Sequence, residues 1–168
     1  MERRIAELDE SKIDERSRVL LIELSNHPAR RHASLQMETS HDGTWRLFVA
    51  IPSPTGDDRR AVSIWFDERQ IPTLEFGAWH SHAGLWDEDL LAGIRKMLAY
   101  LERIIDGEIV LAGAPTIGEG VPFRVIDLGD GDEVLDKLTS PVVPTDIRLL
   151  SWSGAQDAQL SDFREEPA

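Results

Sequence analysis

The sequence predicts an α+β fold, in which an antiparallel β-meander sheet is covered on one face by a long amphipathic helix. Between residues 33 and 79, turn-forming residues separate short runs in which apolar and polar residues alternate, as is typical of antiparallel strands joined by short connections. From residue 87 to residue 106, apolar residues recur every three or four positions, which indicates a helix with one apolar stripe. A shorter stripe of the same spacing predicts an N-terminal helix over residues 12–25.

Length and composition indicate one domain. The chain has 168 residues, of which 41% are hydrophobic, an ordinary content for a globular protein. We place the domain at residues 1–155 and interpret the polar, acidic residues 156–168 as a disordered tail. The chain has no cysteine, which excludes disulfides, thiolate metal sites and a cysteine nucleophile. Because we find neither a signal-peptide pattern nor an apolar run that could span a membrane, we expect a cytoplasmic location.

The N-terminal helix carries signals at both of its ends. Ser11 and Asp14 have the spacing of a capping pair at its start. Pro28 ends it, because the residue before a proline disfavours helical backbone geometry. Residues 2–10 are expected either to extend this helix or to fray.

The strands of the meander are expected to follow one another closely. Asp42 and Gly43 are the preferred residues for a tight hairpin turn, and the Pro- and Gly-containing residues 52–58 indicate a loop. A second turn is expected at residues 67–70. The predicted strands are residues 33–40, 44–51, 60–66 and 73–79.

The long helix is expected to begin with Asp87 as its cap, followed by two further acids in the first turn, where the helix dipole favours negative charge. Gly107 is expected to end it. Its wide apolar stripe predicts that the helix packs on one face of the sheet. Three shorter strands are expected after it, at residues 108–112, 123–128 and 146–152.

The formal net charge of the chain is −13, and the acidic excess lies after residue 32. A nucleic-acid-binding protein would show a basic face, and the sequence contains no basic cluster beyond two Arg-Arg pairs. A negative field of this kind repels phosphates and anionic membranes and attracts basic proteins. We therefore expect no nucleic-acid or membrane partner, and a basic protein is the partner that the charge favours.

One short segment, Trp79-His80-Ser81-His82, has residues that could carry chemistry. In an extended strand His80 and His82 project from the same face, as a chelating pair would, and imidazole is a ligand for zinc and other divalent metals. A catalytic zinc site needs a third protein ligand, for which the candidates are Asp87, Asp89, Glu38 and Glu75. If the strand stays extended, however, the two histidines continue the apolar face that the long helix covers. They would then be packing residues.

The segment Gly77-Ala-Trp-His-Ser-His is similar to the start of the JAMM metalloprotease motif, which has two zinc-binding histidines. In that family the pair is followed at fixed spacing by a serine and a ligand aspartate. The corresponding positions of this sequence hold Leu90 and Gly93, so the similarity is limited to about six residues.

A longer resemblance runs through residues 61–112, where AVSIWF is followed by LEFGAWHSHAGLW, a long amphipathic helix and IDGEIVLAG. This pattern resembles small cytosolic immunity proteins of bacterial polymorphic-toxin systems. The residues that carry the match are Gly77, Trp79, His80, His82, Asp106, Gly107 and Ile109. The resemblance implies a stoichiometric binder that blocks a toxin domain and has no catalytic activity of its own.

Tryptophans are candidate anchors for such a partner, because tryptophan is enriched in interface hot spots. Trp45 and Trp65 lie in alternating strand patterns, so we expect them in the core. Trp86 is the best candidate for an exposed aromatic, although it could instead pack onto the first turn of the long helix. The candidate binding residues are Trp79, His80, His82, Trp86 and Asp87.

The leading hypothesis is thus a non-catalytic protein-binding module of the toxin-immunity type, without a cofactor. The alternative is a metal-dependent hydrolase in which His80 and His82 bind zinc or another divalent metal. The sequence leaves the identity of the partner and the oligomeric state open.

Overall fold

Two antiparallel sheets and two α-helices make up the part of the chain that the computed structural model describes, residues 5–39, 43–67, 69–85, 87–113, 124–130 and 148–159. The α-helices are α1 (Glu15–Ser25) and α2 (Leu90–Ile105). Short 3-10 helices are η1 (Pro28–His32), η2 (Asp58–Arg60), η3 (Ala83–Leu85) and η4 (Leu128–Asp130). The strands are β1 (Ile5–Glu7), β2 (Ser34–Thr39), β3 (Trp45–Ile51), β4 (Val62–Phe66), β5 (Pro72–Phe76), β6 (Trp79–His82), β7 (Ile109–Gly113), β8 (Arg124–Asp127), β9 (Arg148–Leu150) and β10 (Ala158–Gln159).

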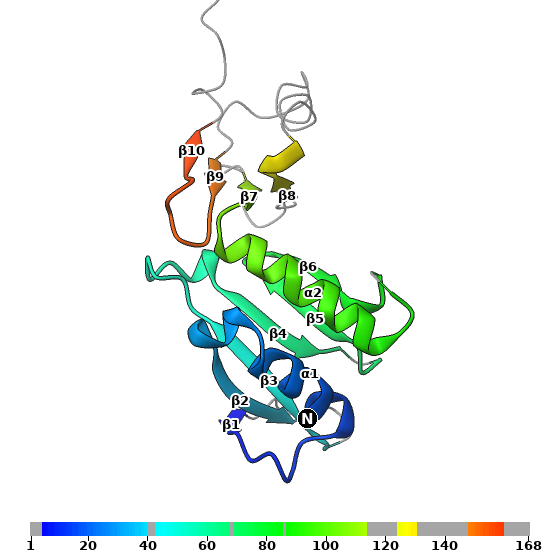
Figure 1. Ribbon diagram of the computed structural model, residues 1–168. Helices are drawn as coiled ribbons and strands as arrows, with labels where there is room; N and C mark the ends of the chain where they lie inside the picture. The colour runs from blue at the N-terminus through cyan, green and yellow to red at the C-terminus, as the bar shows by residue number, and fades with distance from the viewer. Residues whose placement is uncertain are drawn as a thin grey trace, which may run out of the picture.

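The larger sheet has the order β1-β2-β3-β4-β5-β6, so each strand pairs with its neighbours in the sequence. All five pairings are antiparallel, which confirms the predicted α+β fold with an antiparallel meander. Figure 1 shows α1 and α2 over the same face of this sheet. Leu20 and Leu24 of α1 and Leu98 of α2 are buried in one core cluster with Leu47 and Leu74 of the sheet. No described helix is long and apolar enough to cross a membrane.

Both helices begin later than the sequence predicts. Asp14 is itself the cap of α1, and its side chain accepts the backbone N–H of Ser17 at 2.8 Å. Helix α2 starts at Leu90 because Asp89 is its cap. The Asp89 side chain accepts a hydrogen bond of 2.8 Å from the backbone N–H of Ala92, which has no partner within the helix. The expected cap Asp87 lies before the helix.

Residues 5–7 form strand β1, so the expectation that residues 2–10 extend the N-terminal helix or fray is wrong for these three residues. Ala6 faces Met37 of β2 and packs against the core, so tertiary pairing overrides the local helical preference. The turn between β1 and α1 is closed by Asp9, whose side chain accepts hydrogen bonds from Ser11 and forms an ion pair with Lys12. These contacts lower the pKa of Asp9 to about 2.

The expected strand at residues 73–79 is in fact a hairpin, in which a two-residue turn at Gly77 and Ala78 separates β5 from β6. Gly77 has φ +55°, a conformation that favours glycine. A Cβ at this position would also collide with the backbone carbonyl of Arg59 and the side chain of Leu111. The turn reverses the chain, so Phe76 faces Trp79 and Glu75 faces His80.

The smaller sheet has the order β10-β9-β7-β8 and lies beyond the C-terminal end of α2 (Figure 1). Strand β7 contributes side chains to two hydrophobic cores. Ile109 and Leu111 belong to the main cluster, whereas Val110 and Ala112 belong to a second one. Residues 156–159, expected in a disordered tail, form a turn and β10. The rest of that expected tail lies outside the described residues.

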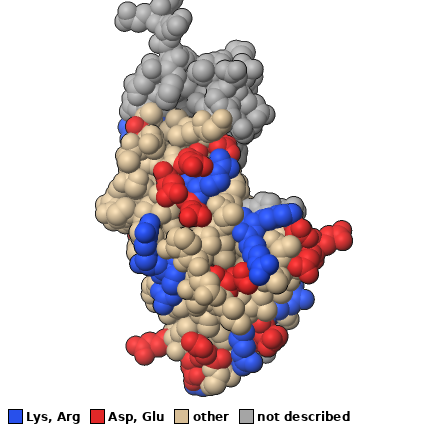
Figure 2. Space-filling view, viewed as in Figure 1, with Lys and Arg blue, Asp and Glu red and all other residues tan. Residues whose placement is uncertain are grey.

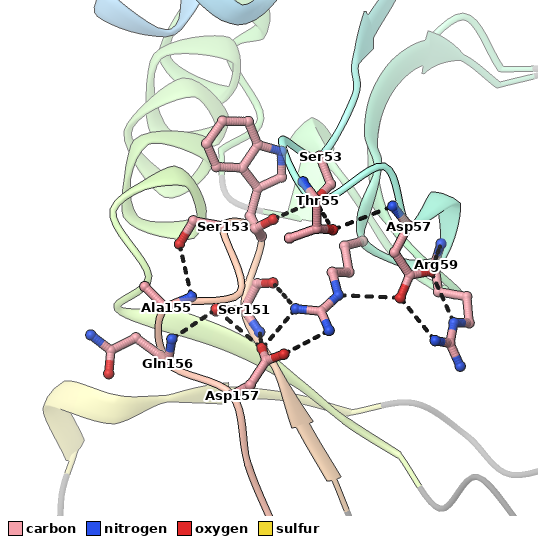
Figure 3. A network of polar contacts seen from close by, with 11 residues as sticks. Ser53, Thr55, Asp57, Arg59, Ser151, Ser153, Ala155, Gln156 and Asp157 are labelled. Carbon is pink, nitrogen blue, oxygen red and sulfur yellow. Dashed lines mark hydrogen bonds and ion pairs between the residues drawn. The ribbon is translucent and has the colours of Figure 1, made fainter.

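A polar network around Arg60 joins the two sheets (Figure 3). Its guanidinium donates to Asp157 at 2.7 Å, to Asp57 at 3.2 Å and to the carbonyl oxygen of Ser151 at 3.2 Å. The side chain of Arg60 is 11% exposed. Ser53 adds a hydrogen bond of 2.6 Å to the carbonyl oxygen of Trp152, whose side chain is part of the main core. The network therefore fixes the residues around β9 and β10 against the loop before β4.

We predict that Arg60→Ala lowers the free energy of unfolding by about 2–3 kcal/mol, because the partly buried Asp57 and Asp157 would lose their shared cation. The control is Arg59→Ala. Arg59 also pairs with Asp57, but its side chain is 67% exposed, so the expected cost is below about 1 kcal/mol. Urea unfolding followed by tryptophan fluorescence measures the free energy of unfolding of both variants. Equal losses in the two variants would contradict the central place of Arg60 in the polar network.

Candidate functional site

The face of the larger sheet that points away from α1 and α2 carries the polar and aromatic residues of interest. Residues that oppose each other in antiparallel strands have their side chains on the same face, so the pairing register defines this set. We call it the outer face, and it comprises Ile5, Glu7, Ser34, Gln36, Glu38, Arg46, Phe48, Ala50, Ser63, Trp65, Thr73, Glu75, His80 and His82. The alternate strand residues, such as Leu47, Ile64 and Leu74, are buried in the core beneath the helices.

His80 and His82 lie together on the outer face. The prediction that they share a face is confirmed, and their ring centroids are 5.5 Å apart with an interplanar angle of 74°. The interpretation that they continue the helix-covered apolar face is wrong, because it required an extended strand through Gly77. The turn at Gly77 instead places them opposite Glu75 and Thr73, with His80 exposed and His82 half-buried.

His82 is anchored through one ring nitrogen. The hydroxyl of Thr73, a fully buried residue, donates to the carbonyl oxygen of Ile71 at 3.4 Å and lies 2.8 Å from His82 Nδ1. The Asp67 carboxylate is 3.5 Å from the same nitrogen. The adjacent Asp67 carboxylate favours a proton on Nδ1, and in that tautomer Nδ1 donates to the Thr73 hydroxyl. The Nε2 nitrogen then keeps its lone pair for a ligand.

Trp65 and Glu75 form the neighbouring part of the site. The indole Nε1 of Trp65 donates to Glu75 Oε2 at 3.0 Å, and the Ser63 hydroxyl donates to the same oxygen at 3.4 Å. Trp65 is half-buried on the outer face, so its expected place in the core is wrong, whereas Trp45 does pack against the core. Glu75 faces His80 in the register, which brings a carboxylate beside the exposed imidazole.

The other expected site residues do not join the histidine pair. Trp79 packs on the helix side against Tyr100 of α2, with ring centroids 5.7 Å apart, and burial raises the pKa of Tyr100 to about 12. Asp87 accepts a hydrogen bond of 2.9 Å from Lys96, and this ammonium lowers the pKa of Asp87. Trp86 lies outside the described residues. Of the five residues, the structure brings together His80 and His82.

Among the described residues, this pair of imidazoles is the donor set that one chain brings together. Within the described ranges, no group of three or more His, Cys, Asp or Glu side chains is placed to hold a metal ion. Glu75, a sequence-based candidate for a third ligand, engages Trp65 and Ser63 through one carboxylate oxygen. No family model, no curated protein and no solved structure matches the chain.

Sequence reasoning named Glu75 as a candidate partner of the histidines, but it missed Thr73 and Asp67 as neighbours of His82 and Trp65 as the partner of Glu75. The signal that could have found them is Gly77, because a glycine inside a strand pattern often marks a bulge or a turn. If a two-residue turn is placed at residues 77–78, alternation on either side puts Thr73, Glu75, His80 and His82 on one face. The contact with Asp67 depends on the fold around β4 and has no local signal.

We predict that the neutral form of His82 carries its proton on Nδ1, and that Thr73→Val shifts the tautomer towards the Nε2-protonated form by removing the acceptor. Long-range proton–nitrogen correlation spectra of the imidazoles report both forms, with His27 as an internal reference. An unchanged tautomer in Thr73→Val would show that Thr73 does not set it.

Proposed function

We propose that this chain is a non-catalytic protein-binding module of the toxin-immunity type, located in the cytoplasm, which binds a basic protein such as a toxin domain through the outer face of its larger sheet. The observation that carries the proposal is the composition of this face, where two half-buried aromatic residues, Phe48 and Trp65, lie on the same face as the carboxylates of Glu7 and Glu75. Aromatic residues are enriched at protein interfaces, and polar residues form the rim around them.

The electrostatics of the outer face favour a basic partner. Its strand residues include Glu7, Glu38, Glu75 and one arginine, Arg46. Glu38 and Arg46 face each other in the register and are each 4% exposed, whereas Glu7 is exposed and Glu75 is half-buried. The exposed charge of the strands on this face is therefore negative. Figure 2, which shows the side seen in Figure 1, has basic and acidic side chains interspersed. Complementary charge raises the rate of association with a basic partner.

Two aromatic side chains could act as anchors in this interface. Phe48 lies on β3 and Trp65 on the adjacent β4, and the register in which Val49 faces Ile64 places the two side chains near each other. Both are half-buried, so each keeps apolar surface for a partner. Partly exposed aromatics on a rigid sheet lose little conformational entropy on binding, which is why such residues become hot spots.

The alternative function is a metal-dependent hydrolase, and the spacing of His80 and His82 is the observation that favours it. A catalytic zinc ion requires three protein ligands and an open position. The described residues of one chain supply two imidazoles, so the hydrolase would need a ligand from elsewhere. Zinc-dependent hydrolysis that is lost in a His80→Ala/His82→Ala variant would support this alternative instead.

To test the proposal, the full chain is titrated against a panel of purified basic nuclease-toxin domains, with affinity and toxin activity measured at physiological salt. We predict a one-to-one complex with at least one domain, inhibition of its activity, and about 30-fold weaker binding by Trp65→Ala, corresponding to the ~2 kcal/mol of a hot spot.

A charge-matched pair of variants locates the interface. Glu75→Gln should weaken binding and slow association, whereas Glu15→Gln removes the same charge from an 84% exposed side chain on α1 and should leave binding unchanged within about twofold. Absence of binding to every toxin domain, or equal effects of the two glutamate variants, would contradict the proposed interface.

A further inference from the structure

The strand β6 leaves one edge open in the described part of the chain. The larger sheet ends at β6, and no described strand pairs with its far side. In a hairpin with a two-residue turn, the residues that flank the turn exchange backbone hydrogen bonds, and such pairs alternate along the ladder. Phe76 with Trp79 and Leu74 with Ser81 are therefore the bonded pairs. The backbone N–H and C=O groups of His80 and His82 point outwards, away from β5.

The side chains of the same two residues have the separation of two ligands of one metal ion. Two imidazoles bound to one tetrahedral zinc ion at about 2.0–2.1 Å would have ring centroids roughly 5 Å apart. The observed separation is 5.5 Å. One chain offers no third ligand among its described residues, so the site is incomplete without a second donor set.

We propose that two copies of the chain pair their β6 strands antiparallel about a two-fold axis at Ser81, and that the four imidazoles of His80 and His82 from both copies bind one divalent transition-metal ion of the zinc class. This register opposes each His80 to the His82 of the other copy. Both residues have outward backbone groups, so the pairs can exchange backbone hydrogen bonds as an antiparallel ladder requires.

The geometry of a sheet brings the four rings to one place. A two-fold axis perpendicular to the sheet keeps the outer faces of the two copies continuous, so all four imidazoles lie on the same side. Opposed residues have Cα atoms about 5.5 Å apart across the strands, and residues two apart in one strand are about 6.8 Å apart. Four imidazoles over a rectangle of this size can reach one tetrahedral ion above the Ser81 pair.

The anchoring of His82 prepares it as a ligand. Its Nδ1 faces Thr73 at 2.8 Å and Asp67 at 3.5 Å, which leaves Nε2 for the metal. Metal-binding histidines commonly donate the other ring N–H to a carboxylate or a similar acceptor, which fixes the ring and raises its basicity. The sequence of β6, Trp-His-Ser-His, also lacks the lysine or proline that usually blocks an open edge.

The experiment measures the mass and zinc content of the untagged full chain by native mass spectrometry and light scattering, in EDTA, with ZnCl₂ and with MgCl₂. The expected result is a monomer in EDTA and in MgCl₂, and in ZnCl₂ a dimer that contains one zinc ion per two chains. The His80→Ala/His82→Ala variant should stay monomeric in ZnCl₂, with a circular dichroism spectrum that matches the unmodified chain.

A second variant tests the anchoring without removing a ligand. Thr73→Val keeps the side-chain shape and removes the acceptor for His82, so zinc affinity should fall about 10–100-fold while the dimer still forms at high zinc concentration. The proposal would be overturned by one zinc ion per chain without a change in mass, by no zinc binding, or by a zinc-induced dimer that persists in the double histidine variant.

Discussion

The turn at Gly77 determines which side of the molecule receives each residue of β6. At φ +55°, and with the carbonyl of Arg59 and the side chain of Leu111 where a Cβ would have to lie, this position accepts glycine alone without local rearrangement. Because a side chain changes face at every residue of a strand, reversing the chain after Phe76 sends Trp79 to the helix side and the two histidines to the outer face. The aromatic contact with α2 and the imidazole pair therefore depend on the same turn.

The contact between Gly77 and Leu111 also links the two sheets. Leu111, which packs against Gly77, belongs to β7, and β7 contributes alternate side chains to the main core and to the smaller one. Arg60 follows Arg59 directly and carries the ion pair to Asp157 near the end of the described chain. The stretch Arg59-Arg60 before β4 therefore contacts both regions. The backbone carbonyl of Arg59 packs against the hairpin turn, and the side chain of Arg60 holds the residues next to the smaller sheet. A change in this stretch would act on both the outer face and the packing of the smaller sheet.

The sequence was sufficient for the elements whose signal is local and repeated. The apolar stripe of α2 and the alternation in β3 and β4 each reflect the burial of one side of a single element. The predicted bounds of these three elements lie within a few residues of the observed ones. Three features were not predictable in this way. Strand β1 exists because Ala6 pairs with Met37 across a long connection, the cap of α2 is chosen between nearby aspartates by which one reaches Ala92, and the histidine environment depends on Asp67 from another connection. The pairing of the two histidines on one face was predictable, since strand periodicity alone sets it, but the identity of that face was not.

The edge of β6 and the outer face can bind different partners, because the binding groups of the edge lie in the plane of the sheet and those of the outer face point perpendicular to it. Backbone groups of an edge strand lie in the plane of the sheet, whereas side chains project from it. Trp65 lies on β4, two strands from the edge, and Phe48 lies on β3, one strand farther, so pairing at β6 would not involve the strands that carry these aromatic residues. A two-fold at Ser81 would also place two copies of the acidic outer face side by side on one continuous surface. Association at the edge would then present two binding faces to a basic partner, which raises apparent affinity without any new contact within one copy.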